Sequence, residues 1–266
     1  MLANLGEVRN WGYEALLNAQ LVSRRNFAWD ATVSASRNSN ELLTLGNDAA
    51  GKPIPPIIGT STQQRPGYPL NGYWQRGFSY NDANKDGIIV PAEVTIDTAV
   101  TFQGYSQPRL ELTFVNGFDL FNRRLRISSL IDHKSGYKVL NSEQQFLCQQ
   151  SLSCKATSSH DATVYEQARA IAQRFKTPQT TAGYMEDVTF TRIRELSATY
   201  NVESAWAQRL LKAQSVGIVF AVRNLAVFTD WTGVDPEQNY GEANLQQTLL
   251  TAGPPRYFTF RVNLRY

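Results

Sequence analysis

Long runs of alternating apolar and polar residues recur along the chain and constrain its fold more than any other feature. In WGYEALLNAQL, residues 11–21, the apolar side chains recur at every second position, and FAWDATVSAS, residues 27–36, repeats the pattern. Because successive side chains of a β-strand point to opposite faces, each run predicts a strand with one apolar and one polar face. Further runs lie at 110–131, 187–201, 215–228 and 257–266. The dipeptide Asn116-Gly117 is a strong hairpin signal that divides 110–131 in two, so seven strands are expected.

The lengths of these strands and of their connections favour a membrane. The runs are about twice as long as the roughly five or six residues usual in soluble sheets, and they match a tilted strand that crosses a bilayer. Short connections near 22–26, 116–117 and 202–213 alternate with long ones near 45–101, 133–187 and 230–255. Outer-membrane barrels alternate short turns and long external loops in this way. Arg261 and Arg265 fall on the polar face, which suits a watery lumen. We therefore expect an all-β chain that forms part of a transmembrane antiparallel β-barrel.

Composition and motifs exclude several other classes of protein. The formal net charge is only +3, with Lys and Arg scattered, which argues against nucleic-acid binding. No run approaches the roughly 18 apolar residues of a membrane helix, and MLANLGEVRN does not have the pattern of a signal peptide. The sequence contains no G-x-S-x-G, no Walker loop, no H-E-x-x-H and no G-x-G-x-x-G, so an enzyme is not expected.

Two cysteines and one amphipathic segment predict local structure in the long loops. Cys148 and Cys154 are too few for a zinc site, and a small disulfide-closed loop in an oxidising compartment is favoured over two free thiols. TVYEQARAIAQRF, residues 163–175, predicts a short helix folded over the barrel mouth, although a helix inside another core would show the same stripe. The apolar stripe consists of Val164, Ala168, Ile171, Ala172 and Phe175.

The stretch DANKDGIIVPAE, residues 82–93, matches the calcium-loop template D-x-[DN]-x-[DN]-G-x5-E. The flanking segments are rich in Pro, Gly and β-branched residues, so the paired helices of a calcium sensor are not expected. Two interpretations stay open: a structural Ca²⁺ that rigidifies an external loop, and a solvated Asx-rich turn. The ligands of such a calcium site would be the side chains of Asp82, Asn84, Asp86 and Glu93 and the backbone carbonyl of Ile88.

Five segments, taken in order, resemble a known family. They are NLGEVRNWGYE, the DANKDG loop, YMEDVTFTRIRELSATY, VRNLAVFTDWTGVDPE and a final strand that ends in an aromatic residue. Together they are similar to the C-terminal part of a SusC/RagA-type TonB-dependent outer-membrane transporter, over nearly the whole chain, 1–266. The resemblance implies a 22-stranded barrel with an N-terminal plug, of which the plug, the TonB box and the earlier strands are absent here. Since an odd set of strands leaves two unpaired edges in lipid, the chain is interpreted as a fragment of such a transporter.

The resemblance also implies a location, partners and a function. It implies a barrel in the lipid of the outer membrane, energised through TonB by way of the missing N-terminal part, with a SusD-like lipoprotein over its mouth. The implied cargo is a large nutrient, either an oligosaccharide or a peptide. The alternative function is a secreted or surface β-sandwich that binds carbohydrate with a structural calcium. That alternative explains the calcium loop and the cysteines but not the alternating loop lengths.

Several residues are candidates for particular roles. Asn224, Asp235, Pro236 and Glu237 belong to the family-like motifs and are expected to support the last external loop rather than to touch cargo. The resemblance implies that Tyr266, at the end of a strand, is part of the signal read by the barrel-assembly machinery, the alternative being an ordinary girdle aromatic.

Four aromatic residues of the first long loop could stack on sugar rings, although packing of the loop onto the rim is the more common role of such side chains. They are Tyr73, Trp74, Phe78 and Tyr80.

Overall fold

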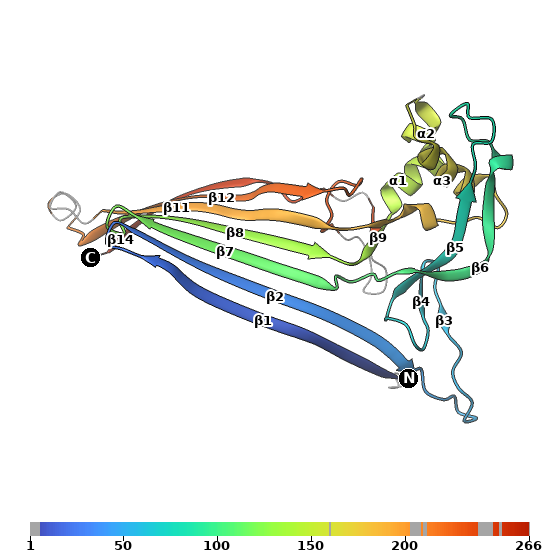
Figure 1. Cartoon of the computed structure of the whole chain (residues 1–266), viewed down its shortest axis with the longest axis horizontal. Helices are drawn as coiled ribbons and strands as arrows, with labels where there is room; N and C mark the ends of the chain where they lie inside the picture. Colours follow the sequence, from blue (N-terminus) through green and yellow to red (C-terminus); the bar gives the residue numbers. More distant parts are fainter. Residues whose placement is uncertain are drawn as a thin grey trace.

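In a computed structural model, the chain forms one long antiparallel sheet with a layer of loops at one end (Figure 1). The structure describes residues 6–159, 161–202, 209, 212–238, 247–249 and 252–265. Seven strands make up the sheet, in the order β1-β2-β7-β8-β11-β12-β14. Their bounds are β1 Glu7–Ser23, β2 Phe27–Thr44, β7 Leu110–Leu120, β8 Leu125–Ser135, β11 Phe190–Val202, β12 Ser215–Thr229 and β14 Tyr257–Arg265. The expected number of strands in this sheet and their antiparallel pairing are confirmed.

The two ends of the sheet differ as the sequence predicted. Residues 24–26 join β1 to β2, and residues 121–124 join β7 to β8, at what we call the turn end. The connections β2–β7, β8–β11 and β12–β14 are long and meet at the opposite end, called the loop end (Figure 1). This strict alternation is the pattern of an outer-membrane barrel.

One face of the sheet is apolar and remains exposed. Val33, Phe114 and Ile131 lie side by side on β2, β7 and β8 on this face. On β14, Phe258 and Phe260 are 68% and 69% exposed. A soluble protein rarely leaves so continuous an apolar surface in water, whereas lipid covers it at no cost. The transmembrane, all-β fold class is therefore confirmed.

The opposite, polar face carries ion pairs between neighbouring strands. Arg126 of β8 contacts Asp30 of β2 at 2.9 Å and Asp119 of β7 at 3.1 Å. Lys134 of β8 contacts Glu111 of β7 at 3.2 Å. Charged side chains of this kind are tolerated where a strand faces water and are costly where it faces lipid. The polar face therefore faces the lumen.

The loop layer has secondary structure and hydrophobic cores of its own. A four-stranded sheet, which lies in the long connection expected near 45–101, consists of β3 Ile57–Ile58, β4 Thr62–Gln64, β5 Gly72–Tyr80 and β6 Val94–Gly104. A three-stranded sheet consists of β9 Lys138–Asn141, β10 Met185–Asp187 and β13 Gln247–Thr248. The helical segments are η1 Pro91–Glu93, α1 Ser142–Phe146, η2 Leu147–Ser151, α2 Lys155–Ser158, α3 Val164–Arg174 and η3 Ala182–Tyr184. Among the residues described, no helix is both long and apolar enough to cross a membrane.

The predicted helix is α3, and its ends follow from the sequence. Thr163 caps it by accepting a hydrogen bond from the Glu166 backbone, and the Glu166 carboxylate accepts one from the Thr163 backbone in return. Most of the expected stripe packs in one cluster with β6, namely Val164, Ala168, Ile171 and Ala172. Phe175 was wrongly assigned to this stripe: it follows the last helical residue and is 60% exposed.

The hairpin predicted at Asn116-Gly117 is wrong, because both residues lie within β7 and the turn falls at residues 121–124. Gly117 is on the polar face, where an added Cβ would overlap the Arg126 guanidinium as it crosses to Asp30. Asn116 is on the apolar face, and its side-chain oxygen accepts a hydrogen bond from the Trp29 indole at 3.2 Å. The two residues therefore support contacts between neighbouring strands and do not form a turn.

We expect Gly117→Ala to destabilise the protein by about 1–3 kcal/mol, because the added methyl displaces the Arg126–Asp30 pair. Thermal unfolding of the detergent-purified protein measures the effect. Gly217→Ala is the matched control: it also lies within a strand of this sheet, but the nearest atom to its Cβ is the Asn201 side-chain oxygen at 3.2 Å. Equal losses from the two variants would show that Gly117 has no special steric role.

Candidate functional site

Two arginines of β11 form ion pairs that hold the β12–β14 connection against the loop end of the sheet. Arg192 is only 3% exposed and donates from Nη2 to both carboxylate oxygens of Asp235, each at 2.7 Å. Its other terminal nitrogen donates to the side-chain oxygen of Asn224 at 2.7 Å. Bidentate contacts between Arg and a carboxylate are strong and fix orientation. The segment around Asp235 is therefore held firmly against β11 and β12.

Glu237 bridges Arg192 to Arg194. It lies 2.9 Å from Nε of Arg192 and 2.6 Å from Nη1 of Arg194, and Arg194 also contacts Asp132 of β8 at 2.6 Å. The strand register shifts between Ile193 and Glu195, so Arg194, which lies between them, occupies a β-bulge. Bulges commonly redirect a side chain, and this one brings both arginines to the acidic residues.

The family-like residues named from the sequence thus come together. Asn224 has a left-handed backbone, φ +58°, and its amide donates to the carbonyl of Pro254 at 2.9 Å. Asp235 also accepts the backbone N–H of Glu237 at 2.9 Å, which closes an Asx turn around Pro236. These are contacts that would support the loop; that the four residues act as loop support rather than touch cargo stays a prediction. Tyr266 lies outside the described residues.

A second buried ion pair joins helix α3 to the same region. Arg169 contacts Glu186 of β10 at 2.9 Å, and Glu186 accepts a hydrogen bond from the Thr232 hydroxyl at 2.7 Å. The ring of Tyr184 lies 4.8 Å below the Arg169 guanidinium. Burial raises the pKa of Tyr184 to about 12, although Arg169 opposes the shift. The segments YMED, residues 184–187, and DWTG, residues 230–233, are therefore in contact.

Two hollows open at the loop end of the sheet. One, of about 230 Å³, is bordered by Lys134, Tyr137, Pro236 and Glu237 among others. Burial raises the pKa of Tyr137 well above its ordinary value, and the nearby Glu237 adds to the shift. The other hollow, of about 320 Å³, has a largely uncharged polar lining that includes Asn10, Asn38, Ser39, Asn40, Tyr105, Gln107 and Arg109.

The aromatic residues considered for sugar stacking mostly pack inside the loop layer. Tyr73 is fully buried and Trp74 is 5% exposed, so neither can present a ring face to a sugar. Phe78 and Tyr80 lie against Tyr165 of α3, with ring centroids 6.1 and 6.3 Å away. Tyr73 and Trp74 therefore follow the packing alternative, whereas Tyr80 contacts α3 but stays 37% exposed.

In the 82–93 loop, the side-chain oxygens face backbone amides. Asp82 accepts from the N–H of Asp86 at 3.2 Å and of Gly87 at 3.0 Å, and Asp86 accepts from Ile88 at 2.7 Å. Glu93 accepts from Ala83 at 3.1 Å. Within the described ranges, no group of three or more His, Cys, Asp or Glu side chains is placed to hold a metal ion. The loop has the contacts of an Asx-rich turn.

The contacts of Asn84 fit the same arrangement, since its side-chain amide donates to the Asp86 carboxylate at 2.7 Å. Two hydrogen bonds also join the loop to α3. The side-chain oxygen of Gln167 accepts from the N–H of Ile89 at 2.8 Å, and its side-chain nitrogen donates to the Gly87 carbonyl at 2.9 Å. Elsewhere in the loop layer, Cys148 and Cys154 form a disulfide with their Cα atoms 4.8 Å apart.

We expect Asp235→Asn to destabilise the junction by on the order of 3 kcal/mol, because a buried guanidinium loses one of its two carboxylate partners. Limited proteolysis within 230–256, together with the unfolding temperature of the complete receptor, measures the loss. The control is Glu195→Gln, which breaks an exposed pair with Arg223 (side chains 30% and 60% exposed) and should cost less than about 1 kcal/mol. Similar effects from both variants would contradict a special role for the buried pair.

Calcium binding by the 82–93 loop stays a prediction that calorimetry on the complete receptor tests. If the loop rearranges around an ion, adding calcium releases heat and raises the unfolding temperature, and Asp82→Asn removes both effects. Asp48→Asn is the control, because Asp48 forms a similar turn with the backbone of Ala50 outside the motif. No heat and no shift would leave only the turn.

Comparisons with known proteins show which proteins this chain is similar to. No family model matches the chain. Its sequence is 23% identical over 306 residues to TonB-dependent receptor P3 of Formosa agariphila, covering 100% of this chain and 29% of the receptor. It is 23% identical over 286 residues to TonB-dependent receptor SusC of Bacteroides thetaiotaomicron, covering 99% of this chain and 27% of SusC.

Solved structures show the same fold. The RagAB peptide importer in its closed-closed state has a TM-score of 0.75 at 15% identity, over 98% of this chain and 30% of the other. In the open-open state the TM-score is 0.70 at 16% identity, over 98% and 29% of the two chains. The chain thus spans less than a third of its relatives, and their outer-membrane location agrees with the sequence prediction. In sequence, the chain is similar to part of TonB-dependent receptors that include SusC, and in fold it is similar to part of the RagAB importer.

Proposed function

We propose that the chain forms part of the barrel wall and the external loop layer of an active importer that takes large nutrients across the outer membrane. The main observation in support of this proposal is that the sheet has one apolar and one polar face. Its exposed apolar face suits lipid, and its ion-paired polar face suits a watery passage. The likeness to TonB-dependent receptors supports energised import rather than passive diffusion.

The proposed cargo is an oligosaccharide or a peptide. The hollow of about 320 Å³ offers the side-chain amides of Asn10, Asn38 and Asn40 at the loop end of the polar face. Amides both donate and accept hydrogen bonds, so they match the hydroxyls of a sugar as well as the backbone of a peptide. The RagAB importer, whose fold this chain shares, transports peptides, which supports the second class.

The proposed partners are TonB, acting on the complete receptor, and a SusD-like lipoprotein at the loop end. The loop layer, stiffened by the Arg192–Asp235 and Arg169–Glu186 pairs, would give such a lipoprotein a fixed platform. A preformed surface costs less conformational entropy on binding than a disordered one.

The alternative, a carbohydrate-binding β-sandwich, needs a second sheet packed on the apolar face. That face stays open in the described part of the chain, with Phe220 and Phe260 46% and 69% exposed. A single exposed face of this size favours the membrane protein.

A growth experiment tests the proposal. We expect deletion of the receptor gene to stop growth on one class of oligosaccharide or peptide supplied as sole nutrient. The intact gene should restore growth, and a protonophore should stop uptake within minutes because the coupling depends on the proton gradient. Purification of the tagged receptor should also recover a lipoprotein. Uptake that continues in the presence of the protonophore would identify a passive pore instead.

A further inference from the structure

Arg109, at the loop end of the polar face, is a half-buried cation without a carboxylate partner among the described residues. It directly precedes β7 and lines the hollow of about 320 Å³. The carboxylate in the same lining, Glu111, is paired with Lys134 at 3.2 Å. The hollow therefore offers one positive charge that the described protein does not neutralise.

Both the backbone and the side chain of Arg109 are held in place. Its carbonyl accepts a hydrogen bond from the N–H of Asn38 at 3.0 Å, and its own N–H donates to the carbonyl of Ser135 at 3.1 Å. The guanidinium carbon lies 4.4 Å from the ring centroid of Tyr105, and Nη2 donates to the Ser39 hydroxyl at 3.3 Å. A side chain that is already oriented loses less conformational entropy when a ligand binds.

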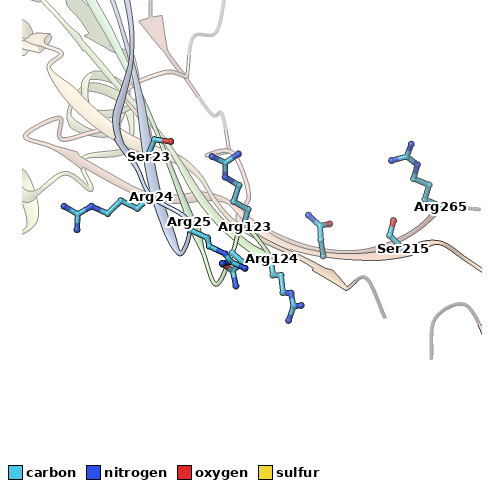
Figure 2. A pocket seen from close by; sticks show the side chains of 9 residues that line it. Ser23, Arg24, Arg25, Arg123, Arg124, Ser215 and Arg265 are labelled. Atoms are coloured by element: carbon cyan, nitrogen blue, oxygen red, sulfur yellow. The ribbon is translucent and has the colours of Figure 1, made fainter. Parts of the chain in front are cut away.

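The arginines at the turn end of the sheet do not converge on one position in this way. Five of them border a hollow of about 920 Å³, namely Arg24, Arg25, Arg123, Arg124 and Arg265. Figure 2 shows their side chains fanned out around the strand ends, pointing in different directions. A specific site needs groups that are held in a fixed arrangement around the ligand. Arg109 meets this requirement better than the turn-end arginines do.

The rest of the lining around Arg109 matches the uncharged part of a polar chain. Asn10, Asn38 and Gln107 supply side-chain amides, which both donate and accept hydrogen bonds. Gln107 and Glu111 also border the hollow of about 230 Å³, so the two hollows adjoin. A chain with one group at Arg109 can therefore continue into the second hollow.

The chemistry of the proposed cargo decides which anion meets this cation. A peptide ends in a carboxylate, and an acidic oligosaccharide carries carboxylates on its uronate units. A hydrogen bond between a guanidinium and a carboxylate is roughly twice as strong as one between neutral groups. We infer that Arg109 binds a carboxylate of the cargo while the neighbouring amides hold the uncharged part of the chain. This inference rests on the proposed import and names the chemical group that the loop end recognises.

The test compares acids with neutral partners of nearly the same shape. The detergent-purified protein is incubated with a random tetrapeptide pool that has either free or amidated C-termini, and bound peptides are counted by native mass spectrometry. Oligogalacturonate is compared with its methyl ester in the same way. We expect the acid of at least one pair to bind about tenfold more tightly than its neutral partner, because a charge-assisted contact is added. The pair that shows this preference identifies the source of the carboxylate.

Variants at two stacked arginines separate recognition from structure. Arg109→Gln should bind acid and neutral forms equally, with the affinity for the neutral form unchanged. Arg109→Lys should keep part of the preference, because it retains the charge but not the planar fork. Arg65→Gln is the matched control: the Arg65 guanidinium lies 4.4 Å from the ring centroid of Trp74 but does not border the hollow, so the preference should stay intact.

Three outcomes would overturn the inference. Equal binding of acid and neutral forms by the unaltered protein would show that Arg109 does not recognise a carboxylate. Equal weakening of both forms by Arg109→Gln would show a structural role. Displacement of the acid by equimolar inorganic phosphate would indicate a site for small anions. Each of these leaves the proposed import intact if growth still needs the gene, whereas growth without the gene would count against import and not against carboxylate binding.

Discussion

The two-faced sheet is the constraint on which the rest of the structure depends. A backbone that crosses hydrocarbon has to satisfy its amides and carbonyls within the sheet, because lipid offers no hydrogen-bond partner. The five inner strands do so through a neighbour on each side. In the described structure β1 and β14 have one neighbour each, so further strands have to continue both edges when the sheet is in a membrane. The coverage of under a third of each relative agrees with this physical requirement.

The loop layer depends in turn on charges buried in pairs. Arg192 reaches acceptors on Asn224, Asp235 and Glu237, so one cation fixes β11, the left-handed turn of β12 and the last long connection. Each ordered residue of such a long connection costs conformational entropy. Charge-assisted hydrogen bonds in a site shielded from water help to offset that cost, whereas the same pairs on an exposed surface contribute little.

The sheet could be predicted from the sequence and the site could not, for a physical reason. Alternation is a local property that follows from strand geometry, so the strands of the main sheet, the loop asymmetry and the capped helix were predictable. The predicted hairpin was wrong because Asn116 and Gly117 are selected by contacts with distant residues: Asn116 binds the Trp29 indole, and Gly117 leaves room for Arg126. The role of Arg192 was missed because its acidic partner lies 43 residues away in the sequence. The sequence held one signal for this contact. The two arginines of RIR, residues 192–194, and the two acidic residues of DPE, residues 235–237, are each two positions apart.

The two ends of the sheet handle positive charge in opposite ways. At the loop end, the buried cations have carboxylates from the same chain, because a charge removed from water needs a partner at once. At the turn end, the guanidinium groups of Arg24 and Arg123 stay exposed and are not paired with any described carboxylate. The contrast follows from burial: the cations of the loop end lie in a dry junction and need partners, whereas the exposed guanidinium groups of the turn end stay solvated by water.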